Sequence, residues 1–161
     1  MAVITPQQAG GKNVVAFLDM IAFSEGTDNG RQRTNDHGYD VLVGGSLFTG
    51  YADHPRKLVT LNPKLKSTAA GRYQLLSRYY DAYKKQLGLK DFSPLSQDLI
   101  AIQQIRERRA LQLIQAGQFE QAVRQVRNIW ASLPGAGYGQ HEQKLDNLLA
   151  AYRRAGGTVA A

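Results

Sequence analysis

Residues 13–26 have the sequence NVVAFLDMIAFSEG, and this stretch decides how the chain folds. Its apolar residues recur three and four positions apart, which is typical of a helix that buries one face. The residues concerned are Val14, Phe17, Leu18 and Ile21. Asn13 is expected to cap the start of the helix, and Gly26 suits its end, because glycine readily adopts the left-handed conformation that closes a helix. Glu25 is therefore predicted to lie at the C-terminus of a buried helix.

Glu25 is the best single candidate for chemistry. A carboxylate at a helix C-terminus meets the negative end of the helix dipole, and Ile21 and Phe23 provide apolar neighbours. Both effects are expected to raise its pKa, and a glutamic acid that keeps its proton near neutral pH can protonate a glycosidic oxygen. The local sequence leaves a second interpretation open, in which Glu25 is an ordinary surface glutamate before a glycine.

Glycoside hydrolysis by the usual route needs a second carboxylate that faces the first. The downstream candidates are Asp28, Asp36, Asp40 and Asp53, and their spacing singles none of them out. Asp28 and Asp40 are equally well explained as residues that form turns. Asp40 is the most interesting of the four, because it leads with Tyr39 into the segment expected to border the cleft.

The remaining sequence predicts a mostly helical domain with one small hairpin. The hairpin is expected at residues 39–48, around Gly44-Gly45, and a loop is expected at 49–63. Three helices are expected at residues 68–87, 95–109 and 141–155, and a fourth begins at Phe119 and carries its apolar stripe to Trp130. Residues 1–12 show no periodicity and are expected to be a loose arm, which leaves 13–161 as a single domain.

Composition narrows the function classes. The chain has 161 residues, a size typical of one domain, and a formal net charge of +7, which favours an anionic partner. It has no cysteine, and its three histidines lack metal-ligand spacing, so neither disulfides nor a structural zinc is expected. No signal peptide is recognisable at the N-terminus. Gly71-Arg72-Tyr73-Gln74 lacks the Walker pattern, so a nucleotide site is not expected either.

Two further surfaces have competing interpretations. The arginines at 106, 108 and 109 could contact nucleic acid, but no nucleic-acid motif accompanies them, and a solvated helix face is the simpler explanation. Residues 136–140 combine glycines with Tyr138 and Gln140, a mixture suited to stacking on a sugar and bonding its hydroxyls, although a plain interhelical loop is the default. Trp130 is expected in the core.

Several longer motifs resemble one family, the phage lambda type of endolysin, also called lambda lysozyme. They include Ser24-Glu25-Gly26-Thr27-Asp28-Asn29-Gly30, Asp53-His54-Pro55-Arg56, Gly71-Arg72-Tyr73-Gln74 and Asn128-Ile129-Trp130-Ala131-Ser132-Leu133-Pro134. The similarity is nearly continuous from about Val15 to Val159. Tyr79-Tyr80 and Phe23 depart from it, at positions where tryptophan is expected, and neither departure affects a proposed catalytic position.

The resemblance implies an α+β, lysozyme-like fold whose helical lobe and small hairpin lobe flank a substrate groove. It implies a cofactor-free lytic transglycosylase, which cleaves the β-1,4 bond between N-acetylmuramic acid and N-acetylglucosamine and forms a 1,6-anhydro ring. One glutamate acts as acid and then as base, and it matches Glu25. The groove is expected to be covered by loops at residues 51–60 and 134–140. Its expected lining is Ser24, Tyr39, Asp40, Tyr73, Gln74, Tyr138 and Gln140.

The resemblance also implies a biological setting. The protein would be a monomeric endolysin made in the host cytoplasm, without insertion into the membrane, and would reach peptidoglycan through a separate holin. Nucleic acid would not be a partner. Two alternatives stay open: a hydrolytic muramidase that uses Glu25 with Asp40 or Asp36, and a non-catalytic basic module that binds the wall or nucleic acid.

Overall fold

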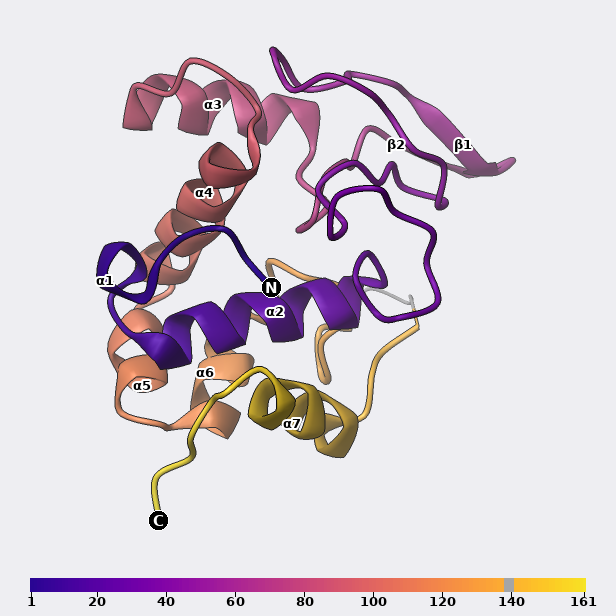
Figure 1. Ribbon diagram of the computed structural model, residues 1–161. Helices are drawn as coiled ribbons and strands as arrows, with labels where there is room; N and C mark the ends of the chain where they lie inside the picture. Colours follow the sequence, from indigo (N-terminus) through magenta and orange to yellow (C-terminus); the bar gives the residue numbers. More distant parts are fainter. Residues whose placement is uncertain (138–140) are drawn as a thin grey trace.

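The computed structural model describes residues 1–137 and 141–161. In Figure 1, α2 lies across the middle of the molecule, with α5, α6 and α7 on one side and α3 and the β-strands on the other. The elements, in chain order, are α1 (Pro6–Ala9), α2 (Lys12–Glu25), β1 (Val59–Asn62), β2 (Leu65–Ser67), α3 (Ser77–Leu87), α4 (Pro94–Glu107), α5 (Leu111–Gln115), α6 (Phe119–Val126) and α7 (Leu145–Arg154). In the described part of the chain, no helix is long and apolar enough to cross a membrane.

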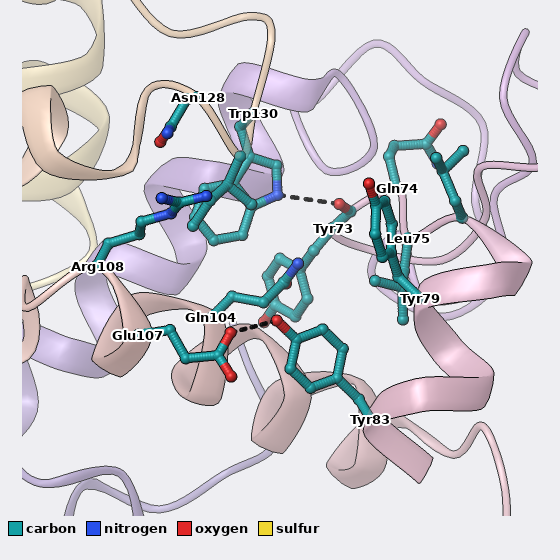
Figure 2. Close-up of a pocket in the computed structure, with 12 residues that line it drawn as sticks. Tyr73, Gln74, Leu75, Tyr79, Tyr83, Gln104, Glu107, Arg108, Asn128 and Trp130 are labelled. Atoms are coloured by element: carbon teal, nitrogen blue, oxygen red, sulfur yellow. Dashed lines mark hydrogen bonds between the residues drawn. The ribbon is translucent and has the colours of Figure 1, made fainter. Parts of the chain in front are cut away.

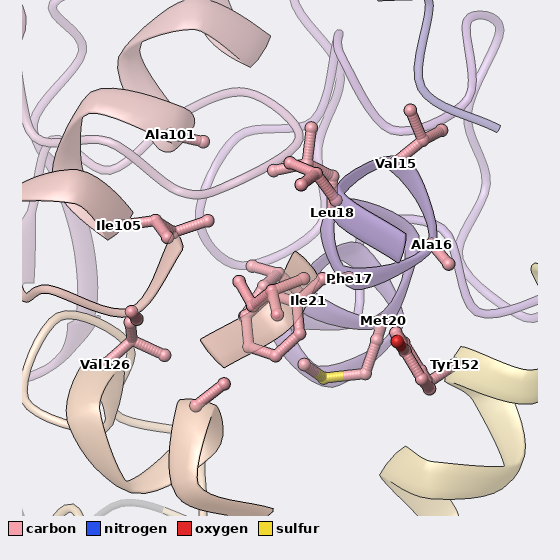
Figure 3. Packing of buried hydrophobic residues seen from close by; sticks show 14 of the residues in the cluster. Val15, Ala16, Phe17, Leu18, Met20, Ile21, Ala101, Ile105, Val126 and Tyr152 are labelled. Carbon is pink, nitrogen blue, oxygen red and sulfur yellow. The ribbon is translucent and has the colours of Figure 1, made fainter. Parts of the chain in front are cut away.

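Helix α2 is the centre of the main hydrophobic core. Phe17 is fully buried and makes edge-to-face contacts with the rings of Phe119, on α6, and Tyr152, on α7. Figure 3 shows Phe17 and Tyr152 in this core. The helix ends as predicted, at Gly26, whose φ of 77° is left-handed and whose N–H donates to the carbonyls of Ala22 and Phe23. The prediction that Asn13 caps its start is wrong. Gly11 holds the N-cap position, and the buried Asn13 side chain instead accepts from the backbone N–H and hydroxyl of Thr158.

The β-structure differs from the prediction. The antiparallel strands are β1 and β2, which pair Val59 with Ser67. Strand β1 lies where a loop was expected, and β2 lies between that loop and the helix expected from residue 68. At residues 39–48 the tight turn at Gly44-Gly45 does form, but its arms share a single bridge, between Val41 and Leu47. The reason is competition for backbone partners, because the Val43 N–H donates to Ala69 and the carbonyl of Val41 accepts from Gly71.

The segment before α3 is folded back on itself, so the prediction that a helix begins at residue 68 is wrong. Gly71 and Gln74 have left-handed φ values of 84° and 53°, and the backbone of Ala70 pairs with that of Leu75. A side chain at position 71 would collide with Gln97, which explains the glycine there. Helix α3 therefore starts at Ser77, although it ends at Gly88 as predicted.

The other helices follow the predicted order with shorter ends. Ser93 caps α4 by accepting from the Ser96 N–H, and Pro94 begins the helix directly after it. Helix α6 ends at Val126, yet Trp130 is still buried, because the chain turns and the indole N–H donates to the Tyr73 carbonyl over 3.1 Å. Helix α7 begins at Leu145 rather than at residue 141, and α1 and α5 were not predicted.

Residues 1–12 are packed, in contrast to the predicted loose arm. Ile4 is only 2% exposed, and three consecutive backbone N–H groups bond to side chains of the domain, of which Tyr39 and Asp98 are buried. These bonds join Ala2 to Asp19 (2.7 Å), Val3 to the Tyr39 hydroxyl (2.9 Å) and Ile4 to Asp98 (3.0 Å). The segment lacks helical periodicity because its order comes from these long-range bonds, which a periodicity argument cannot detect.

Arg72 joins the two sides of the molecule. Its side chain is 1% exposed and forms ion pairs with Asp19 on α2, at 2.5 Å, and with Asp28 in the loop after α2, at 2.8 Å. It also donates to the His37 carbonyl over 2.6 Å. A buried guanidinium is costly unless its charge is matched, and here the two carboxylates and the carbonyl contact both terminal nitrogens, while Nε has no hydrogen-bond partner.

We predict that Arg72→Met destabilises the protein by about 3–5 kcal/mol, because it leaves Asp19 without the charge that compensates its own burial. Urea unfolding at pH 7 measures this loss. Arg124→Met is the matched control, since Arg124 pairs with Glu120 on the exposed face of α6, and its loss should cost about 0.5 kcal/mol or less. Equal effects of the two substitutions would contradict the role assigned to Arg72.

Candidate functional site

Glu25 is the last residue of α2, and its side chain meets a serine from a distant segment. The Ser132 hydroxyl donates a short hydrogen bond to Glu25 Oε2. The Ser132 Oγ atom also lies 2.7 Å from the Oγ atom of Ser24, the residue before Glu25 on α2. Glu25, Ser132 and Ser24 are therefore connected, and Ser24 is only 3% exposed.

The pKa of Glu25 is raised from its ordinary value of 4.5 to about 7. Burial is the main cause, because it removes water from the charged form, and the side-chain and backbone hydrogen bonds from Ser132 oppose the shift. The Glu25 residue as a whole is of intermediate exposure, at the boundary of the core. A carboxylic acid with a pKa near neutrality can exchange a proton in both directions at physiological pH.

Ser132 is held in place by the segment that carries it. The Gln143 N–H donates to its carbonyl over 2.7 Å, and the buried Leu133 follows it in the chain. Two residues earlier, Trp130 is anchored to Tyr73. The sequence prediction assigned no role to Ser132, although the residue lies within one of the motifs quoted above. The local sequence offered one indication that Ser132 lies near the interior: it stands between the apolar residues Trp130 and Leu133, both of which are buried.

A pocket of about 440 Å³ opens beside this segment (Figure 2). Its walls come from the segment before α3, from α3, from the end of α4 and from the chain after α6. The residues that line it are Tyr73, Gln74, Leu75, Leu76, Tyr79, Tyr83, Gln104, Glu107, Arg108, Asn128, Ile129 and Trp130. Glu25 does not line the pocket itself. The two are linked through Trp130, on the pocket wall, and Ser132, which bonds to Glu25.

The pocket combines aromatic rings with polar groups. Tyr79 is 46% exposed, and the Tyr83 hydroxyl donates to Glu107 over 2.5 Å. Gln74 has left-handed backbone geometry, and its side-chain amide donates to the Gly71 carbonyl over 2.9 Å. Apolar faces with a few fixed polar groups are typical of pockets for small or extended ligands.

Two residues predicted to line the groove are structural instead. Tyr39 is fully buried, and its hydroxyl donates to Asp98, at distances of 2.8 and 3.0 Å to the two carboxylate oxygens. Asp40 is 6% exposed and accepts from the Thr34 hydroxyl and the Asn35 N–H. Both were placed in the groove because they lead into a predicted hairpin, and the chain instead turns them into the interior.

The other predicted lining residues have mixed outcomes. Tyr73 and Gln74 line the pocket, although the Tyr73 hydroxyl is turned away from it and donates to Asp98 over 2.6 Å. Ser24 is connected to Glu25 indirectly, because its hydroxyl contacts the Ser132 hydroxyl, which bonds to the Glu25 carboxyl group. Tyr138 and Gln140 lie outside the described residues. Residues 1–137 and 141–161 contain no cluster of acidic or histidine side chains that could hold a metal ion.

Comparison with known proteins agrees with this architecture. The Endolysin family model matches residues 15–159. The endolysin of Escherichia phage lambda is 72% identical over 144 residues, which cover 89% of this chain and 91% of that protein. The endolysin of Escherichia phage P2 is 54% identical over 159 residues, which cover 92% of this chain and 96% of that protein.

The solved structures give the same result. A structure of bacteriophage lambda lysozyme complexed with a chitohexasaccharide has a TM-score of 0.91 at 67% identity, and it covers 99% of this chain and 100% of that one. A second structure, of lysozyme from bacteriophage lambda, has a TM-score of 0.88 at 66% identity with the same coverage. The fold and the relatives together define a lysozyme-like muralytic enzyme. The chain belongs to the endolysin family, as the resemblance predicted.

The raised pKa of Glu25 predicts a stability effect with a definite sign. Between about pH 4.5 and 7 the folded state keeps a proton that the unfolded state has released, so the free energy of unfolding should fall as pH rises. The loss should total roughly 3 kcal/mol across this window. Glu25→Gln has no proton to lose and should therefore lack this component of the pH dependence.

The measurement is urea unfolding from pH 4 to 8 for the parent, for Glu25→Gln and for a control variant. Glu120→Gln, at an exposed position on α6, is the matched control and should keep the parent's slope. If the parent and Glu25→Gln had the same pH dependence, the proposed burial of an ionisable Glu25 would be wrong.

Proposed function

We propose that this protein is a lytic transglycosylase that cleaves the β-1,4 bond between N-acetylmuramic acid and N-acetylglucosamine in peptidoglycan, with Glu25 as its acid and base. The observation that carries the proposal is the protonatable carboxyl group of Glu25, raised in pKa to about 7 and held by Ser132. The endolysin family membership gives the substrate class.

In the proposed reaction Glu25 acts twice. Its acid form protonates the glycosidic oxygen as the bond to the muramyl C1 atom breaks, which leaves an oxocarbenium-like sugar. The resulting carboxylate then accepts the proton of the muramyl 6-hydroxyl, and that oxygen bonds to C1 and closes a 1,6-anhydro ring. The proton is returned to Glu25, so the enzyme ends the cycle in its starting state without water as a reactant.

The state of the two candidate aspartates, Asp36 and Asp40, supports a mechanism with one carboxylate. Both oxygens of Asp40 are engaged, by Thr34 and by Asn35, and Asp36 accepts from the Tyr51 hydroxyl over 2.7 Å. A hydrolase of the usual kind needs its second carboxylate available to a water molecule or to the sugar. The hydrolytic alternative with Asp40 or Asp36 is therefore disfavoured.

The pocket is proposed as part of the glycan groove. Tyr79 offers an exposed ring for an apolar sugar face, and Gln74 and Gln104 offer amides for its hydroxyl and N-acetyl groups. The similar lambda lysozyme was solved with a chitohexasaccharide, which suggests a glycan of that kind as the ligand here.

The two loops are proposed to restrict water access to the bound sugar. Near residues 134–140, the exposed Glu142 carboxylate accepts from the N–H groups of Gly135 and Gly137, both over 3.1 Å. Within residues 51–60, Arg56 forms ion pairs with Asp53 in the same loop and with Asp81 on α3. Scarce water matters in this reaction because an intramolecular hydroxyl must compete with solvent for C1.

We infer the biological role from the family. The protein would be a monomer made in the host cytoplasm and released to the wall by a separate holin, without inserting into the membrane and without a nucleic-acid partner. The formal net charge of +7 suits a wall that carries carboxylates and phosphates. A non-catalytic module that only binds the wall is the alternative from another class.

We predict that Glu25→Gln lowers the rate of sacculus solubilisation by at least about 10³-fold, because the amide can neither donate nor accept the reactive proton. Folding and wall sedimentation should be unchanged, and Glu120→Gln should retain full activity. Turbidity clearing measures the rate, and a fully active Glu25→Gln would end the proposal. A parent that binds sacculi without clearing them would favour the non-catalytic module.

The products distinguish the two enzymatic mechanisms. We expect parent enzyme to release muropeptides with 1,6-anhydromuramic ends, which are lighter by one water than the products of hydrolysis. Mass spectrometry with and without borohydride reduction checks this, because an anhydro end has no reducing carbon to take up hydride. Products with reducing ends would identify a hydrolase instead.

A further inference from the structure

We propose that Ser24 and Ser132 form a hydrogen-bond chain that reserves Glu25 Oε2 and leaves Oε1 as the atom that gives and receives the reactive proton. Both serines are positioning residues in this account, because they act on the substrate through Glu25. The inference rests on the proposed function and goes beyond it, because it identifies the carboxyl oxygen that transfers the proton and the side chains that orient it.

The direction of the chain follows from counting protons. A serine hydroxyl has one proton, and that of Ser132 is used in the bond to Glu25 Oε2. The contact of 2.7 Å between Ser132 Oγ and Ser24 Oγ must then use the proton of Ser24. With Glu25 ionised, the chain therefore runs from Ser24 through Ser132 to Oε2.

This arrangement determines where the proton is placed in the acid form. Oε2 already accepts from Ser132, so a proton bound at Oε1 preserves both serine hydrogen bonds. A proton bound at Oε2 would reverse the bond to Ser132, whose hydroxyl would then accept from Oε2 and need another acceptor for its own proton. The chain therefore favours Oε1, and no proton passes along the serines during the reaction.

The backbone makes this geometry reproducible. Ser24 and Glu25 lie in the last turn of α2, and the left-handed Gly26 ends that helix directly after them. Ser132 is fixed from the other side, because its carbonyl accepts from the Gln143 N–H and the nearby Trp130 is bonded to Tyr73. Ordered supports on both sides limit the freedom of the carboxyl group, as positioning requires.

Charged groups on α2, on α7 and in the segments beside them are engaged with other partners than Glu25. On and after α2, Asp19 and Asp28 pair with Arg72. On the loop before α7, Glu142 accepts from glycine N–H groups. On α7, Arg154 lies over the ring of Phe23, 5.7 Å from its centre. Loss of the Ser132 donor should thus raise the pKa of Glu25 further, since burial would act with less opposition.

The test is the pH profile of kcat/KM for sacculus clearing in four variants: Ser132→Ala, Ser24→Ala, their double mutant and Ser132→Thr. Activity should fall above the pKa of Glu25, because the first step needs its acid form. Ser132→Ala should move this alkaline limb up by about one pH unit and lower kcat at neutral pH about tenfold. Ser132→Thr keeps a hydroxyl and should restore the parent profile.

Ser24→Ala should produce a smaller shift in the same direction. Because Ser24 acts through Ser132, it should add nothing in the Ser132→Ala background, and this non-additivity separates a chain from two independent effects. A merely structural role would lower the melting temperature and leave the alkaline limb unmoved, which would overturn the inference. Should Ser132→Ala fail to fold, the shift in Ser24→Ala and the rescue in Ser132→Thr decide the question.

Glu25→Gln, assayed in parallel, separates the two proposals. An active Glu25→Gln would refute the proposed function, and the serine chain would fall with it. An inactive Glu25→Gln together with an unmoved limb in the serine variants would refute the serine chain alone.

Discussion

The buried ion pairs of Arg72 are the interaction on which the arrangement of the site depends. Arg72 contacts Asp19 inside α2 and Asp28 just after it, while its own backbone leads directly into Tyr73 and Gln74 on the pocket wall. The helix that ends in Glu25 and the wall of the pocket are therefore fixed to each other by one side chain. Its cost of desolvation is offset because two carboxylates and a carbonyl surround it.

The same burial that stabilises the core sets the chemistry of the site. Helix α2 is surrounded on most of its length, and its last residue is surrounded enough that the acid form is favoured up to about pH 7. Ser132 limits the shift by donating to the carboxylate. An acid that must release a proton and take it back benefits from this balance, since too high a pKa would prevent release and too low a pKa would prevent return.

Much of the fold was predictable from local patterns. The apolar spacing in residues 13–26 predicted the central helix, and the structure confirms its predicted end at Gly26 and the predicted end of α3 at Leu87. The predictions failed where backbone partners are distant in sequence. The pairing of Val43 with Ala69 shortened the expected hairpin, and the bonds from Ala2 to Asp19 and from Ile4 to Asp98 ordered an arm that has no periodicity.

The candidate site was predictable in part. Helix-end electrostatics selected Glu25, while the family resemblance, confirmed by the comparisons, supplied the class of reaction. Tyr39 was wrongly predicted to line the groove, because its hydroxyl donates to Asp98, 59 positions away in the sequence. Ser132 was not predicted, because its partner Glu25 lies 107 positions away. Neither contact leaves a pattern in neighbouring residues, so both required the folded structure.

The central claim is that Glu25 is protonated near neutral pH because burial raises its pKa, although the hydrogen bonds from Ser132 oppose that rise. Carbon-13 NMR titration of the glutamate carboxyl signals, with Glu25 assigned by its disappearance in Glu25→Gln, measures this most directly. The account predicts that the Glu25 signal titrates with a midpoint near pH 7. A midpoint near the ordinary glutamate value of 4.5 would contradict it.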